Sequence, residues 1–178
     1  MREILFRAKA KNSIDRQDYV KENEWAYGAY VNNKIKVYGG EEIEQHIIVV
    51  QDPVGNLVAQ PVYENTVGQY TGFTDKNGNK IFEGDVMRSD YYPYSCIPKT
   101  FGDTYNKEWT PEKDNYVLIA DWSEEDGMFI GVIAKMKASK VRGGSHGIPV
   151  EFEQDYMKRF EIIGNIHDKE MLEKIEEL

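Results

Sequence analysis

The chain has 178 residues, of which 40% are hydrophobic and 30% charged, a composition typical of a folded globular protein. It carries 31 acidic and 22 basic residues, and a net charge of −9 argues against attraction of the whole chain to a phosphate backbone. A single cysteine excludes an intramolecular disulfide framework.

The first predicted element is a strand near the N-terminus, where Ile4, Phe6 and Ala8 alternate with other positions. Arg7 and Lys9 interrupt the long apolar run that a secretory signal would need. The longest apolar stretch, residues 47–50, is too short to span a bilayer. We therefore expect a cytoplasmic protein that has no membrane partner.

Residues 1–65 are predicted to form an N-terminal β-rich segment. Strands are expected over 25–31 and 34–38, with Asn32 and Asn33 as the hairpin turn between them. Further extended segments follow at 47–50 and 57–63, whereas the polar stretch at 11–23, before the first of these strands, shows no clear period.

The middle of the chain carries the clearest turn signals. Asn77 and Gly78 predict a hairpin turn of type I′, because both residues tolerate a positive φ. A second tight turn is expected at 83–85, and a strand should start at Val86.

Residues 89–115 are predicted to be a long insertion, with three prolines and no sustained period. Its aromatic residues either pack against the rest of the domain or offer a contact surface, since tyrosine and tryptophan are favoured at protein interfaces. The candidate contact residues are Tyr91, Tyr92, Tyr94, Tyr105 and Trp109.

A hairpin is predicted from strands at 116–122 and 128–134, and the segment that follows it is basic. This basic strip is a candidate nucleic-acid contact, made of Lys135, Lys137, Lys140 and Arg142. The alternative interpretation is a solvated strand edge on which lysines prevent edge-to-edge association.

A last strand is expected at 159–166, and a short C-terminal helix at 168–178. The apolar residues of this helix fall on one stripe, which should dock on the same chain or on a neighbouring one. Asp168 can serve as its N-cap.

The residues do not form a recognisable catalytic, cofactor or metal site. His46, His146 and His167 are far apart in sequence, and none stands at ligand spacing from another histidine or from Cys96. Phosphate-binding glycine motifs and a nucleophile elbow are both missing from the sequence. We therefore assign no catalytic, metal-binding or cofactor-binding residue, and we lean against an enzyme.

Three blocks of the chain resemble the YopX family of bacteriophage and prophage proteins. They are the opening Arg2-Glu3-Ile4-Leu5-Phe6-Arg7-Ala8, the central segment from Thr66 to Val86, and the run Phe160-Glu161-Ile162-Ile163-Gly164-Asn165-Ile166-His167. The resemblance implies a mainly β fold with a small barrel, an uncharacterised activity and a location in the cytoplasm of a bacterial host cell.

Together these features predict a small SH3-like barrel over 66–167, with added N-terminal strands, the 89–115 insertion and the C-terminal helix. The leading hypothesis is a non-catalytic accessory protein that binds a host or phage protein, and self-association is also plausible. The alternative is a nucleic-acid-binding barrel that uses the basic strip. A third hypothesis is that the acidic surface mimics nucleic acid.

Overall fold

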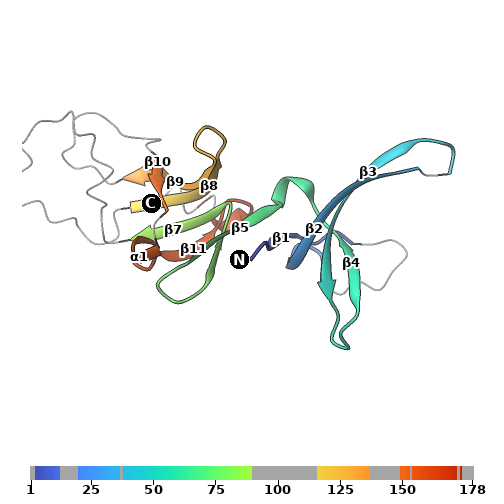
Figure 1. Cartoon of the computed structure of the whole chain (residues 1–178), viewed down its shortest axis with the longest axis horizontal. Coiled ribbons are helices and arrows are strands. Elements are labelled where there is room, and N and C mark those ends of the chain that lie inside the picture. Colours follow the sequence, from blue (N-terminus) through green and yellow to red (C-terminus); the bar gives the residue numbers. More distant parts are fainter. Residues whose placement is uncertain are drawn as a thin grey trace, which may run out of the picture. The chain divides into compact units, whose positions relative to one another are not determined.

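The computed structural model describes residues 3–12, 20–36, 38–89, 116–136, 149–152, 154–171 and 173. The chain divides into two compact units, residues 1–70 and residues 71–178. Both are built mainly from antiparallel strands, which Figure 1 labels in chain order. The predicted mainly β fold class is therefore confirmed.

The first unit is a twisted antiparallel sheet with the strand order β4-β3-β2-β1-β5. Its strands are β1 (Phe6–Lys9), β2 (Trp25–Lys36), β3 (Glu42–Gln51), β4 (Leu57–Pro61) and the start of β5 (Gly68–Thr74). A 3-10 helix, η1 (Glu64–Thr66), connects β4 to β5. Beyond β4, Val62 forms an antiparallel bridge with Ala10, so the sheet curls back toward β1.

The core of the first unit lies on the concave side of this curl. Ala8, Ala26, Ile48, Val50 and Val62 are buried there, from four different parts of the sheet. Alternate residues of each strand point to this side, as the two-residue period of a β-strand requires.

One sequence-based prediction for this unit is wrong. Asn32 and Asn33 do not form a turn, because both lie inside the continuous strand β2 and pair with His46 and Gln45 of β3. The chain reverses later, where Gly39 and Gly40 both adopt a positive φ. Two neutral asparagines resembled a turn, but the pairing of β2 with β3 through all eight positions from Ala29 to Lys36 outweighs that local preference.

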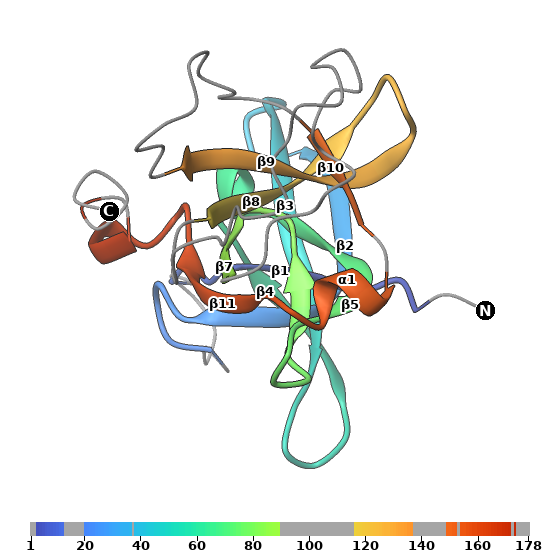
Figure 2. The same cartoon turned by 90° about the vertical axis from the view of Figure 1, so that its left-hand side faces the viewer.

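The second unit contains a five-stranded antiparallel sheet with the order β10-β9-β8-β7-β11. Its strands are β7 (Asp85–Ser89), β8 (Tyr116–Ser123), β9 (Met128–Met136), β10 (Pro149–Glu151) and β11 (Glu161–Asn165). The later part of β5 pairs with the short β6 (Lys80–Phe82), and a one-turn helix, α1 (Gln154–Met157), precedes β11 (Figure 2). Among the described residues neither sheet closes completely into a barrel.

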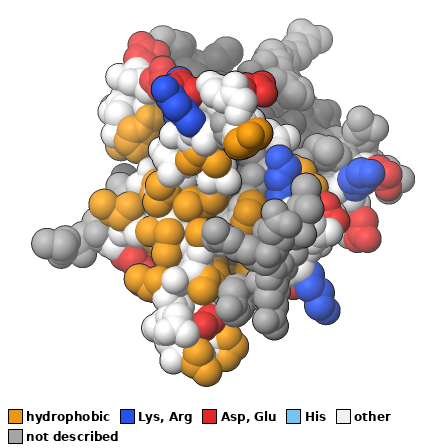
Figure 3. Space-filling model, turned by 90° about the vertical axis from the view of Figure 1, so that its right-hand side faces the viewer, with side chains coloured by type: hydrophobic (Ala, Val, Ile, Leu, Met, Phe, Trp, Pro, Cys, Tyr) orange, Lys and Arg blue, Asp and Glu red, His pale blue; other side chains and the backbone are white. Residues whose placement is uncertain are grey.

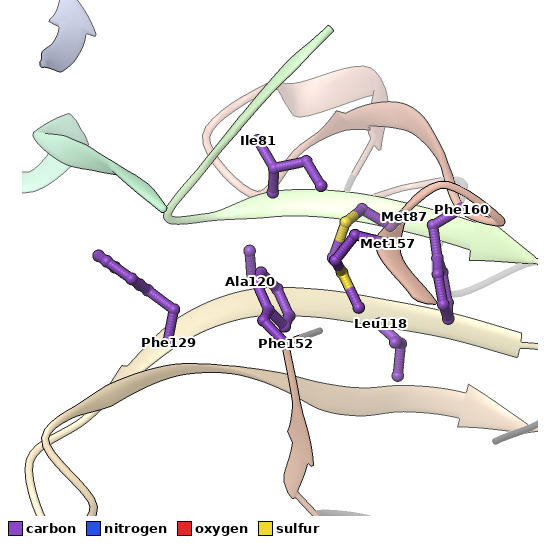
Figure 4. Packing of buried hydrophobic residues seen from close by; sticks show 8 residues of the cluster. All are labelled: Ile81, Met87, Leu118, Ala120, Phe129, Phe152, Met157 and Phe160. Carbon is purple, nitrogen blue, oxygen red and sulfur yellow. The ribbon is translucent and has the colours of Figure 1, made fainter. Parts of the chain in front are cut away.

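The core of the second unit is larger and rich in aromatic and sulfur-containing side chains. Met87, Leu118, Met157 and Phe160 converge between β7, β8 and the segment that carries α1 (Figure 4). All four are at most 2% exposed. Methionine fills irregular gaps between such elements because its side chain is long and unbranched.

Two buried aspartates explain the turn signals in the middle of the sequence. Asp75 Oδ1 accepts hydrogen bonds from the backbone N–H groups of Asn77 and Asn79, at 2.9 and 2.8 Å. Asp85 Oδ2 accepts one from the N–H of Phe82, at 2.8 Å. Gly78 has a positive φ but Asn77 does not, so the turn is present and its predicted type I′ geometry is wrong.

The C-terminal segment docks on the second unit. Residues 169–171 and 173 are helical, and Met171 is buried in a cluster with Val86 and Val117. A Cβ atom on Gly164 of β11 would lie 2.6 Å from Met171 Sδ, so this glycine makes room for the methionine. For Met171, therefore, docking on the same chain is confirmed.

Candidate protein-binding face

The convex side of the first unit's sheet is the most distinctive surface that the structure describes. The register pairs Val31 with Ile47 and Ala29 with Val49, and Val49 in turn with Ala59 of β4. Directly paired residues share a face of the sheet, so these apolar side chains form continuous rows across three strands.

We call this surface the apolar face and define it by thirteen outward positions of β2, β3 and β4. They are Tyr27, Ala29, Val31, Asn33, Ile35, Ile43, Gln45, Ile47, Val49, Gln51, Leu57, Ala59 and Pro61. Ten of these side chains are hydrophobic and three are neutral amides, so no position within the face carries a charge.

The apolar face is open to solvent. Leu57 is 75% exposed, Tyr27 is 48% exposed, and Val31 and Ile43 are each exposed by more than a third. Figure 3 shows hydrophobic side chains gathered over a broad area on this side of the protein. The largest apolar patch on a soluble protein is often a functional contact surface.

Cations border the face along β1. The Arg7 guanidinium carbon and the Lys9 Nζ each lie 4.4 Å from the centroid of a Trp25 ring. Arg7 is only 7% exposed, and a cation held against an indole face is stabilised by the quadrupole of the ring. These two charges are therefore engaged within the chain.

The concave side carries a chain of polar side chains that sequence reasoning did not find. The Tyr30 hydroxyl lies 2.6 Å from His46 Nδ1, and His46 Nε2 lies 3.4 Å from a carboxylate oxygen of Glu64. In the tautomer of His46 that carries its proton on Nε2, this proton faces Glu64 and Nδ1 accepts the hydrogen bond from Tyr30.

This arrangement does not activate Tyr30 as a nucleophile. Burial raises the pKa of the Tyr30 hydroxyl, and the negative charges of Glu64 and Glu44 raise that pKa further. The hydroxyl therefore stays protonated near neutral pH, whereas nucleophilic catalysis needs a lowered pKa or a base that removes the proton. The contacts from Tyr30 through His46 to Glu64 instead connect η1 to strands β2 and β3.

Most of the residues singled out from the sequence lie outside the described part of the chain. This is the case for the five aromatic residues of the insertion and for Lys137, Lys140 and Arg142. Lys135 belongs to β9, where it pairs with Val117 of β8. His46 and His167 are described and lie in different units, and His146 is not described.

Among the residues that the structure describes, no group of three or more histidine, cysteine, aspartate or glutamate side chains is placed to hold a metal ion. None of the helices in the described ranges is both long and apolar enough to cross a membrane.

The apolar face could have been suspected from one feature of the sequence. Residues 47–50 are apolar without alternation, which indicates a strand with hydrophobic side chains on both sides. Two asparagines in β2 and two glutamines in β3 interrupt the hydrophobic pattern of these strands in the sequence. Their side chains are polar, so the sequence does not show that the face is free of charge and mostly apolar.

A search of curated proteins finds no match for the chain. The model of one protein family, described as YopX protein, matches residues 6–173, which is nearly the whole length. The central and C-terminal sequence blocks that suggested this family lie within the matched range, and the first block overlaps its start. The chain therefore belongs to the YopX protein family.

Proposed function

We propose that this protein is a non-catalytic protein-binding module and that the apolar face is its contact surface. One observation carries the proposal: thirteen neighbouring outward positions without a charge, eight of them exposed to solvent. Enclosing such a face removes apolar area from water at a gain of roughly 25 cal/mol per Å². A sheet face without charged groups suits another protein better than a small polar ligand.

The wider biological setting is part of the same proposal. Together with the resemblance of its sequence blocks, membership of the YopX family supports a phage or prophage accessory protein that acts in the cytoplasm of the host cell. The aromatic residues of 89–115 remain a predicted second contact region.

The nucleic-acid alternative rests on the basic strip at 135–142. It predicts an affinity that falls steeply as salt is raised, because bound counterions are released from the phosphates. A hydrophobic contact predicts the opposite trend or none, so a salt series separates the two hypotheses.

The proposal is tested with tagged wild-type protein and two variants, by capture in the presence of nuclease from a lysate of bacteria that also contain the untagged chain. Val31→Lys places a charge in the middle of the apolar face, and Asn32→Lys places the same charge one residue away on the other side of β2. We expect wild type and Asn32→Lys to retain a discrete protein that Val31→Lys loses. Retention of the same protein by all three would refute the role of the face.

A further inference from the structure

We infer that the partner of the apolar face is a second copy of this chain, bound face to face across a twofold axis. The inference rests on the proposed function and names its partner. Two copies of one sheet face form a self-complementary contact when the face has no charge that meets its own image. The apolar face meets this condition at all thirteen positions.

The distribution of charge along the chain supports this partner. The first unit contains eight basic and ten acidic residues, a net charge of −2, and the second contains fourteen and twenty-one, a net charge of −7. The apolar face thus belongs to the nearly neutral unit. Repulsion between two copies is smallest where these units meet, and a charge near zero favours association.

The charges nearest the face also leave little for a different partner to neutralise. Arg7 and Lys9 are held against Trp25, and Lys36 Nζ lies 3.6 Å from a carboxylate oxygen of Glu42. A partner of opposite charge would gain little here, because these groups already have internal partners. The rim therefore lacks a strong determinant for a foreign, charged surface.

The size of the face agrees with a weak dimer. A strand rise of about 3.3 Å and a strand spacing of about 4.8 Å give each outward position about 30 Å² of sheet. The thirteen positions of one copy then cover roughly 400 Å² of sheet. A contact between two copies therefore covers roughly 800 Å² in total, slightly less than the ~1,000 Å² that the smallest specific interfaces bury. The packing expected is that of two sheets about 10 Å apart.

The test measures self-association of the purified full chain by sedimentation at concentrations from about 1 to 200 µM, a range that brackets micromolar affinity. Leu57→Lys is the test variant, because Leu57 lies on the face and is 75% exposed, so the substitution leaves the core intact. Val54→Lys is the matched control: Val54 is 83% exposed in the same β3–β4 hairpin and lies outside the face.

We expect wild type and Val54→Lys to dimerise with equal affinity and Leu57→Lys to dimerise at least about tenfold more weakly, since an unpaired charge is buried in the contact. Circular dichroism checks that all three proteins are folded, and Val31→Lys gives a second reading at the centre of the face. A wild type that stays monomeric at the highest concentration, or a dimer that Leu57→Lys leaves unchanged, would overturn the inference.

The two proposals can fail separately. A monomeric wild type that still captures a protein through the face in the lysate experiment would refute the second copy alone. A monomer that captures nothing through the face would refute both.

Discussion

Asp75 and Asp52 perform the same structural task in the two units. Each begins a stretch with the sequence Asp-x-x-Gly-Asn, and in each case one carboxylate oxygen accepts two backbone hydrogen bonds. The other carboxylate oxygen accepts a bond from the side-chain amide of Asn56 or Asn79. Aspartate suits this position because its short side chain reaches backbone donors two and four residues on. Turn structure thus accounts for both aspartates.

Replacing Asp75 by alanine should destabilise the second unit. The carboxylate also accepts a bond from the Ile162 N–H at 3.2 Å, so alanine leaves several donors without their acceptor. We expect a loss of about 2–3 kcal/mol in the free energy of unfolding, measured by urea denaturation. Glu125→Ala, in an exposed turn of the same unit, should change it by less than about 0.5 kcal/mol. Equal effects of both substitutions would contradict this role.

Acid should weaken the first unit through Asp52. Burial raises the pKa of this carboxyl, but hydrogen bonds from Asn56, Val54 and Gly55 outweigh it, so the pKa lies below its ordinary value. A group whose pKa is lower in the folded state stabilises the fold above its unfolded pKa, near 4, and loses that effect as the pH falls through the folded pKa. Between pH 7 and pH 3 the melting temperature of Asp52→Asn should therefore fall by less than that of the wild type.

At the scale of elements, two glycines allow close contacts that a side chain would prevent. A Cβ atom on Gly28 of β2 would lie 1.9 Å from the backbone oxygen of Val49 in β3. Backbone cannot move aside as a flexible side chain can, so the paired strands that carry the apolar face depend on this glycine.

Gly28→Ala should therefore separate β2 from β3 and cost about 2 kcal/mol or more in the free energy of unfolding. Asn32→Ala, at an exposed position of the same strand, is the control and should cost much less. Chemical denaturation with both variants checks this, and a neutral Gly28→Ala would show that the strands are not in close contact there.

The docking of the C-terminal segment can be tested by a double-mutant cycle. Gly164→Ala should cost about 1–3 kcal/mol, because the new methyl group displaces the Met171 side chain. Met171→Ala should cost about 2 kcal/mol or more through the cavity it leaves. In the double variant the methyl group occupies part of that cavity, so the combined loss should be smaller than the sum. Strict additivity would mean that the two residues do not touch.

At the scale of the whole molecule, most of the net negative charge and the apolar face belong to different units. The second unit carries most of the net negative charge, and the apolar face belongs to the first. Acidic charge keeps a protein with an exposed hydrophobic face in solution, since like charges oppose unspecific aggregation.

Salt should therefore strengthen self-association or leave it unchanged. Raising the ionic strength from about 0.05 to 0.5 M shortens the range of the repulsion between two chains of charge −9 and does not weaken a hydrophobic contact. Sedimentation of the wild-type chain at both salt concentrations measures this. A dimer that dissociates as salt is raised would point to ion pairs in the contact instead.

The sequence by itself determined the elements with strong local signals. The mainly β class, the turn at Asn77 and Gly78, the 116–122 and 128–134 hairpin and the family could all be predicted, because turn residues and two-residue alternation act over short distances. Only the tertiary structure decided that β2 continues through Asn32 and Asn33 and that its outward side chains join those of β3 and β4. The face is made by register between strands, and register depends on long-range pairing that short-range patterns do not specify.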